Sequence, residues 1–236
     1  MIGVVSILGY HKIGPPSPSA WDTWYYVPTE AFARHMDWLA EHEFHPITAS
    51  QFVDAMRGPE SLPPRAVLIT FDDGYRSVLQ HAVPILKRHQ FPAVSFVPTA
   101  HVGSASVWDA DTREPVEPIC SWDELRELQS AGVSVQSHAV THRTFSDLTA
   151  AQIGGEAQDS KRSIERSLAS SVQLRAYPYS DAGRDTAATA ASLRQAGYAA
   201  GLLFTGGVAR LGQHDPFLLP RIPVWPDTDL AKELAP

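Results

Sequence analysis

Residues 66–74 read AVLITFDDG, a short and strongly apolar run that ends in two carboxylates and a glycine. Apolar runs of similar length recur along the chain, each bounded by turn residues, at 4–8, 93–97, 133–136, 172–177 and 198–204. Amphipathic stretches that are typical of helices separate most of these runs. The alternation predicts an α/β domain in which helices cover a parallel sheet, either open or closed into a barrel. The length of 236 residues favours the barrel-like form, built as a single domain over residues 1–236.

Helix starts are marked by residues of the type that caps a first turn, at Thr29, Ser121, Thr149 and Asp185. Ser121 is followed three positions later by Glu124, which is the spacing of a capping box. Residues 108–118 are a polar insertion that contains prolines, so we expect a surface loop there.

Composition excludes several classes of function. The chain has 19 Lys and Arg against 26 Asp and Glu, a net charge of −7, which disfavours nucleic acid as a partner. A single cysteine, Cys120, excludes an intrachain disulfide. No run approaches the roughly 20 apolar residues of a membrane span, and no signal peptide is visible. We therefore expect a cytoplasmic protein, or a secreted or cell-envelope protein if an export signal has been removed.

Polar side chains follow the apolar runs where strands are expected to end. Asp72 and Asp73 follow one run, and His138 and His142, four apart, follow another. Because the carboxyl ends of parallel strands meet at one edge of the sheet, we expect these side chains to lie together. Two imidazoles and one carboxylate suit Zn²⁺ or another divalent ion that activates water. Taken separately, the carboxylate pair is also ordinary turn chemistry, and the two histidines can be unrelated surface residues.

The quoted residues resemble a known family. Residues 70–74 (TFDDG) and 137–142 (SHAVTH) are similar to the first two motifs of the polysaccharide deacetylases, whose domain is the NodB homology domain of carbohydrate esterase family 4. The resemblance extends from YHK at residues 10–12 to LPRIPV at residues 219–224. The YHK and AYPY segments resemble the permuted subgroup that includes the poly-N-acetylglucosamine deacetylases of bacterial biofilms. The resemblance implies a distorted (β/α) barrel and a metal-dependent hydrolase that removes acyl groups from amino sugars.

The resemblance also implies roles for particular residues. The metal ligands correspond to Asp73, His138 and His142. Asp72 corresponds to the general base, His11 to the general acid of the permuted subgroup, and Tyr179 to the residue whose backbone N–H binds the oxyanion. We expect Zn²⁺, with Co²⁺, Ni²⁺ or Fe²⁺ as alternatives, because such a ligand set accepts several divalent ions.

The third family motif, R-P-P-Y-G, is only partly present. Ala176 stands where the motif has its arginine, Arg175 is displaced by one position, and Ser180 replaces the glycine. The C-terminal motif with a catalytic histidine has only a poor match at His214. Arg221, which precedes the last apolar strand, is our candidate for the residue that orients the base, and a structural surface role is the alternative.

The expected substrate is an N-acetylated sugar, as a polymer or a small glycoside, which would release acetate and a free amine. Trp21, Trp24 and Tyr25 lie in an aromatic loop and can stack on sugar rings or cover the barrel. Tyr177 is a further candidate for sugar contact, or part of a rigid turn. The alternatives are an O-acetyl esterase, a deformylase or a cyclic amide hydrolase of the same fold, or a relative that binds sugar without turnover.

Overall fold

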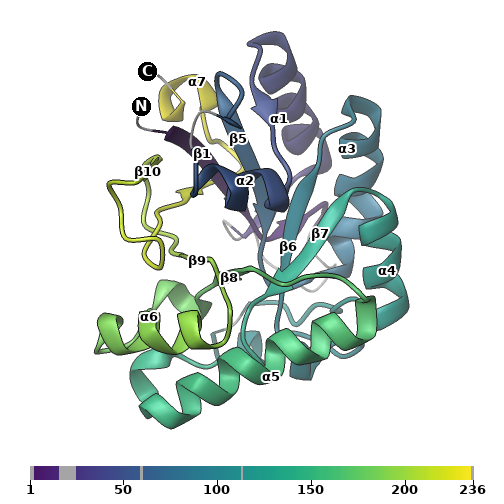
Figure 1. The fold of residues 1–236 in the computed structure, drawn as a ribbon. Coiled ribbons are helices and arrows are strands. Elements are labelled where there is room, and N and C mark those ends of the chain that lie inside the picture. The colour runs from purple at the N-terminus through teal and green to yellow at the C-terminus, as the bar shows by residue number, and fades with distance from the viewer. Residues whose placement is uncertain (1–2, 16–24, 59–60, 113, 235–236) are drawn as a thin grey trace.

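The protein folds into a curled sheet with helices packed against it (Figure 1). The computed structural model describes residues 3–15, 25–58, 61–112 and 114–234. The strands are β1 (Gly3–Tyr10), β2 (Lys12–Ile13), β3 (Tyr26–Val27), β4 (His45–Pro46), β5 (Ala66–Phe71), β6 (Ala93–Val97), β7 (Val133–Ser137), β8 (Leu174–Ala176), β9 (Ala200–Leu202), β10 (Ala209–Leu211) and β11 (Ile222–Pro223). The α-helices are α1 (Thr29–Glu41), α2 (Ala49–Ala55), α3 (Val83–His89), α4 (Trp122–Ser130), α5 (Ala150–Leu168), α6 (Thr186–Gln195) and α7 (Leu230–Glu233). A π-helical turn (Val78–Ala82) precedes α3, and the 3₁₀ turns are Thr99–His101, Val107–Thr112, Phe145–Asp147 and Pro178–Ser180.

The main sheet runs in the order β10-β1-β5-β6-β7-β8-β9, and its central pairs are parallel. The edges of the curled sheet are connected by the segment that contains β11. Leu219 bridges Leu202 in β9, and Ile222 pairs with Leu8 in β1. The predicted α/β fold, a distorted (β/α) barrel, is confirmed.

The apolar run at 66–71 is uninterrupted because β5 is buried on both faces. Val67, Ile69 and Phe71 belong to the core between the sheet and the outer helices. Ala66 and Leu68 belong to a second core, which packs against α2. Figure 1 shows α1, α3, α4 and α5 on the outer side of the sheet.

The helix starts follow their capping signals, with one exception. Ser121 and Glu124 form the predicted capping box at α4, and Thr149 and Asp185 cap α5 and α6. The prediction of a cap at Thr29 is wrong, because Thr29 is the first residue of α1. The N-cap residue is Pro28, whose side chain has no hydrogen-bond acceptor. Among the described residues, no helix is both long and apolar enough to cross a membrane.

Candidate active site

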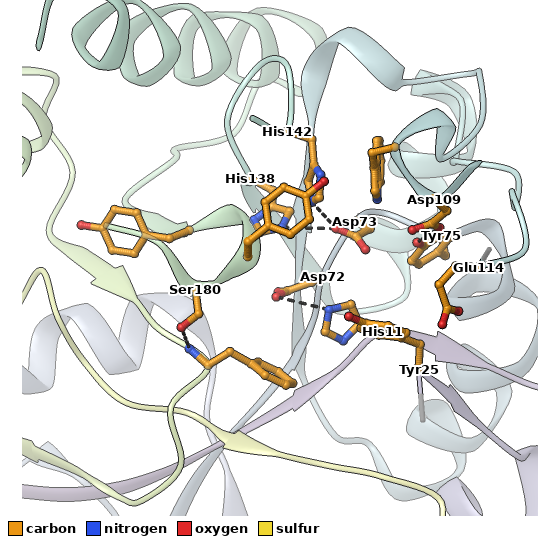
Figure 2. Close-up of a pocket in the computed structure, with 14 residues that line it drawn as sticks. His11, Tyr25, Asp72, Asp73, Tyr75, Asp109, Glu114, His138, His142 and Ser180 are labelled. Atoms are coloured by element: carbon orange, nitrogen blue, oxygen red, sulfur yellow. Dashed lines mark hydrogen bonds and ion pairs between the residues drawn. The ribbon is translucent and has the colours of Figure 1, made fainter. Parts of the chain in front are cut away.

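Side chains from several strand ends line a pocket of about 530 Å³ at the carboxyl edge of the sheet (Figure 2). His11 follows β1, the two aspartates follow β5, and His138 follows β7. Tyr179 reaches the same pocket from the turn after β8. The convergence predicted from the sequence is therefore present.

Asp73 lies against the two histidines. Its Oδ1 atom is 3.2 Å from Nε2 of His138 and 3.0 Å from Nε2 of His142, and all three side chains are buried. Asp73 has the left-handed backbone conformation (φ 68°) that Gly74 continues, so the chain turns sharply at the strand end. Burial would raise the pKa of Asp73, but His142 and His138 hold that pKa well below its usual range.

This cluster fits a metal ion. One ligand atom from each of the three residues lies within 4.8 Å of the others. Nδ1 of His138 donates to the carbonyl oxygen of Ala176 at 2.9 Å, so Nε2 is the ring nitrogen that faces Asp73 and is available as a ligand. The buried Oδ1 of Asp73 has no hydrogen-bond partner among the described residues. Two neutral imidazole nitrogens around an ionised carboxylate oxygen are a donor set for a divalent ion.

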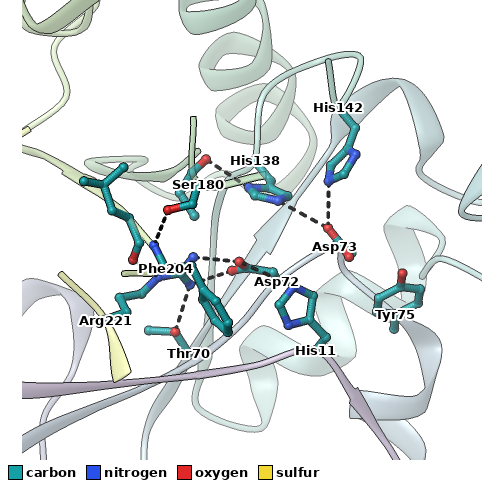
Figure 3. Close-up of polar contacts among 12 residues, drawn as sticks. His11, Thr70, Asp72, Asp73, Tyr75, His138, His142, Ser180, Phe204 and Arg221 are labelled. Atoms are coloured by element: carbon teal, nitrogen blue, oxygen red, sulfur yellow. Dashed lines mark hydrogen bonds and ion pairs between the residues drawn. The ribbon is translucent and has the colours of Figure 1, made fainter. Parts of the chain in front are cut away.

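Asp72 points away from this cluster and pairs with Arg221 (Figure 3). The guanidinium donates to both carboxylate oxygens, at 2.7 and 2.6 Å, and Arg221 is fully buried. Two further bonds hold the guanidinium, to the carbonyl of Leu203 at 3.0 Å and to Oγ1 of Thr70 at 3.2 Å. Burial works to raise the pKa of Asp72, but Arg221 holds the pKa below its ordinary value, so the carboxylate is ionised.

His11 faces the other side of Asp72. Its Nε2 is 4.0 Å from Oδ2 of Asp72, and its ring contacts the edges of Tyr25 and Phe204 at centroid distances of 5.0 and 5.1 Å. Burial lowers the pKa of His11 despite the opposing effect of Asp73 and Asp72. An imidazole in this position can exchange a proton with a group bound between it and the cluster of Asp73, His138 and His142.

Arg221, the candidate for the arginine that orients the base, is the residue paired with Asp72. The other two motif candidates, Arg175 and His214, lie elsewhere. Arg175 is buried and packs its guanidinium 4.5 Å from the ring centre of Phe145. His214 lies beyond β10, where its Nδ1 accepts a bond from the N–H of Arg210 at 3.3 Å.

The aromatic candidates divide. Trp21 and Trp24 lie outside the described residues, whereas Tyr25 lines the pocket. Tyr179 is 55% exposed and approaches the ring of His142 edge-on at 4.9 Å. Tyr177 borders the pocket but is only 1% exposed, and its hydroxyl donates to the carbonyl of Phe217 at 2.9 Å. Its position fits the rigid-turn alternative, and we do not assign it a sugar contact.

The prediction of a surface loop at residues 108–118 is wrong in part, because three described residues of this segment form one wall of the pocket. Trp108 stacks on His142 with ring centres 4.0 Å apart and planes 24° apart. Asp109 and Glu114 line the same pocket. Sequence reasoning missed these three residues, and the tryptophan within a polar insertion is the one signal that could have identified them.

The wall is held in place by a buried ion pair. Nζ of Lys12 donates to Oδ2 of Asp109 at 3.2 Å and to the carbonyl of Pro115 at 3.1 Å. The hydroxyl of Tyr75 donates to the same Oδ2 at 2.9 Å. These contacts draw the polar segment inward, where periodicity alone gives no indication of burial.

Comparison with known proteins agrees with the fold and shows the family. A family model described as polysaccharide deacetylase matches residues 60–201, which is more than half of the chain. The chain therefore belongs to the polysaccharide deacetylase family. The matched range contains the aspartate pair and the histidine pair, whereas His11 and Arg221 lie outside it.

Individual relatives extend the match. YxkH of Bacillus subtilis strain 168 is 26% identical over 207 residues, which cover 88% of this chain and 67% of that protein. The poly-beta-1,6-N-acetyl-D-glucosamine N-deacetylase of Escherichia coli K12 is 36% identical over 120 residues, or 48% of this chain, and the match spans only 17% of that enzyme's length. The structure of the Streptococcus pyogenes deacetylase PplD in complex with acetate superposes with a TM-score of 0.88, 22% identity and full coverage of both chains. That superposition supports the fold.

Proposed function

We propose that this chain is a metal-dependent N-deacetylase that removes acetyl groups from N-acetylglucosamine units of a glycan. The observation that carries the proposal is that the two adjacent carboxylates have different partners. Asp73 faces two histidines, while Asp72 is held by Arg221 beside His11, and all but Arg221 border one pocket. Metal-dependent amide hydrolysis uses two such parts, a Lewis acid and a base–acid pair.

Asp73, His138 and His142 would hold the ion, which we expect to be Zn²⁺, with Co²⁺, Ni²⁺ or Fe²⁺ as alternatives. When bound, a divalent ion of this kind supplies a Lewis acid that polarises a carbonyl and lowers the pKa of water toward about 7. Arg221 keeps Asp72 ionised and fixes both carboxylate oxygens.

The proton steps belong to the protein's own side chains. Asp72 accepts a proton at its carboxylate as water attacks the acetamide carbon. The backbone N–H of Tyr179 donates to the oxyanion that forms on the former carbonyl oxygen. His11, whose Nε2 is 4.0 Å from Oδ2 of Asp72, takes up the proton that Asp72 accepted and passes it to the nitrogen as the C–N bond breaks, because an amide nitrogen leaves only as a neutral amine. The products are acetate and the free amine.

The substrate class rests on relatives and on the pocket. The Escherichia coli relative acts, by its name, on poly-beta-1,6-N-acetyl-D-glucosamine. Tyr25, Trp108 and Tyr179 give this pocket aromatic surfaces that suit the apolar faces of pyranose rings. We therefore place β-linked N-acetylglucosamine oligomers ahead of monomeric glycosides.

A substrate panel on metal-reconstituted protein, with released acetate as the readout, tests the proposal. We expect acetate from β-1,6-linked N-acetylglucosamine oligomers and loss of at least 100-fold in turnover in Asp72→Asn, which retains the metal ligands. His138→Ala should lose both metal and turnover. Release of acetate only from O-acetylated sugars, or tight sugar binding without turnover, would contradict the proposal. Near-normal turnover by Asp72→Asn would show that Asp72 is not the base.

A further inference from the structure

The loop between β7 and the 3₁₀ turn at Phe145–Asp147 carries both histidines of the metal cluster in a strained conformation. Ala139 and His142 both have positive φ angles, 70° and 56°, in a backbone region that residues other than glycine rarely adopt. Such a backbone persists only where surrounding contacts determine it. The contacts that hold residues 139–141 therefore decide where the second histidine lies.

The two histidines are oriented by different means. His138 is fixed through its own ring, because Nδ1 donates to the carbonyl of Ala176. The Nδ1 atom of His142 is buried and has no hydrogen-bond partner among the described residues. A histidine that binds metal is usually oriented by a bond from its other ring nitrogen. His142 must take its orientation from its backbone and from the aromatic rings that pack against it.

The carboxylate of Glu156 on α5 accepts hydrogen bonds from the residues directly before His142. Oε2 of Glu156 accepts from the N–H of Val140 at 2.6 Å and from the N–H of Thr141 at 3.1 Å. Oε1 accepts from the hydroxyl of Thr141 at 2.6 Å. Three donors from consecutive residues thus converge on a single side chain, directly before His142.

The other bonds that the structure describes for residues 139–141 are two main-chain bonds and one bond from the N–H of Ala139 to Oγ of Ser137 at 3.3 Å. The N–H of Thr99 donates to the carbonyl of Ala139 at 3.1 Å, and the N–H of Ala100 donates to the carbonyl of Val140 at 2.9 Å. Among these contacts, Glu156 is the side chain that comes from another element and holds the two residues directly before His142. Charge-assisted bonds to a carboxylate are also stronger than bonds between neutral groups.

We propose that Glu156 is a positioning residue for the metal site. Its carboxylate fixes residues 140–141, and through them it presents Nε2 of His142 to the position that Nε2 of His138 and Oδ1 of Asp73 also face. The inference rests on the proposed metal-dependent function. It assigns Glu156 no contact with substrate and no proton transfer.

The same helix offers a matched control. Oε1 of Glu165 accepts from the N–H of Val172 at 3.1 Å and pairs with Lys161 at 2.9 Å. Glu165 therefore also ties α5 to a neighbouring loop by a carboxylate, but this loop leads into β8 and carries no ligand of the cluster. A general loss of loop anchoring should affect both variants, whereas a loss of ligand positioning should affect only Glu156.

The experiment measures zinc affinity by competition with a chromophoric chelator, with the visible spectrum of Co²⁺-loaded protein as a second readout. We expect Glu156→Ala to bind zinc about 10–100-fold more weakly than the wild type and to alter the Co²⁺ spectrum. Glu156→Gln should recover most of the affinity, because its amide oxygen can still accept the two backbone N–H groups while its NH₂ faces the hydroxyl of Thr141. Glu165→Ala should match the wild type in both measurements.

A milder variant covers the case in which Glu156→Ala does not fold. Thr141→Val removes only the hydroxyl contact and should weaken zinc binding by a factor of about 3–10. If folded Glu156→Ala binds zinc as tightly as the wild type, the inference is overturned. If Glu156→Ala does not fold, unchanged zinc affinity in Thr141→Val overturns it instead. In either case, zinc binding and deacetylation by the wild-type protein leave the proposed function intact. A wild-type protein that binds no divalent ion overturns both.

Discussion

Two adjacent aspartates receive opposite environments because they follow a buried strand. The chain turns sharply at Asp73, so Asp72 meets the guanidinium of Arg221 while Asp73 meets two imidazoles. Each carboxylate is kept ionised by a different partner. At the scale of single residues, the site therefore depends on one strand register, since a shift by one position would leave one of the two places without an aspartate.

Replacing Arg221 tests how Asp72 is tuned. Arg221→Met leaves a buried carboxylate without its cation, which we expect to cost about 3–5 kcal/mol of unfolding free energy. Burial then dominates, so the pKa of Asp72 rises. A base acts only when ionised, so activity should be lost at a higher pH than in the wild type as the medium is acidified. The pH profile of kcat/KM measures this shift.

A double variant separates stability from chemistry. In Arg221→Met combined with Asp72→Asn, no buried charge is left unpaired, so we expect the double variant to be more stable than Arg221→Met alone. Its activity should stay as low as that of Asp72→Asn. Chemical denaturation and acetate release provide the two measurements. An unchanged pH profile in Arg221→Met would refute the assignment of Arg221 as the orienting residue.

The residues at the site were predictable to different degrees. Asp73 and His138 were predictable because parallel strand ends share one edge, and short motifs mark them. Arg221 was only a candidate, since the signal was an arginine before a short apolar strand, 149 residues from Asp72. The stacking of Trp108 on His142 was not predictable, because it depends on a buried ion pair of Lys12 with Asp109, 97 residues apart.

At the scale of elements, the turns that follow the strands carry the strain of the site. Tyr179 and Ser180 both have positive φ angles, 55° and 58°, and the hydroxyl of Ser180 accepts from the N–H of Phe204 at 2.7 Å. This turn begins where β8 ends and brings Tyr179 to His142. The strand runs were predictable from apolar periodicity, whereas turn conformations follow from contacts between distant segments.

Asp181 should make the stability of this turn depend on pH. Its carboxylate accepts from the N–H of Ser146 at 2.8 Å, the hydroxyl of Ser146 at 2.9 Å and the N–H of Gly183 at 2.8 Å. Burial works to raise the pKa of Asp181, but these donors hold it below the ordinary value. The stabilisation is therefore fully present above the unfolded-state pKa and is lost as the pH falls through the lower folded-state pKa.

We expect Asp181→Ala to lower the unfolding free energy by about 1–3 kcal/mol at pH 7, a cost that shrinks below about pH 4. Urea denaturation of both proteins across pH 3–7 provides the comparison. A difference that stays constant over this range would mean that the carboxylate charge contributes nothing.

Strand β9 passes so close to Tyr177 that only glycine fits at position 201. A Cβ atom there would lie 2.5 Å from the hydroxyl oxygen of Tyr177, whose ring is buried. We expect Gly201→Ala to destabilise the protein by about 1–3 kcal/mol through overpacking. Gly155→Ala is the control, because the structure places nothing within 4 Å of that Cβ on α5, and it should stabilise by about 0.5–1 kcal/mol. Equal melting temperatures for the two variants would contradict this account.

At the scale of the whole molecule, closure of the curled sheet assembles the site. Residues 219–223 bridge β9 to β1, and this closing segment carries Arg221 to Asp72 on the central strand β5. The sequence predicted a sheet that is open or closed, because local periodicity cannot specify which edges meet. Catalytic geometry and closure of the fold thus depend on the same contacts.

Metal binding should therefore stabilise the whole domain. An ion held by Asp73, His138 and His142 connects the ends of β5 and β7, and at a free concentration 100 times its Kd it adds about 2.7 kcal/mol. For a chain of this size that corresponds to a rise of about 5–10 °C in Tm. Differential scanning calorimetry with zinc, and after removal of zinc by a chelator, measures the change. A variant with both His138→Ala and His142→Ala should show no response, because only Asp73 of the three ligands remains. A wild-type Tm indifferent to zinc and chelator, or an equal zinc response in the double variant, would place the ion elsewhere.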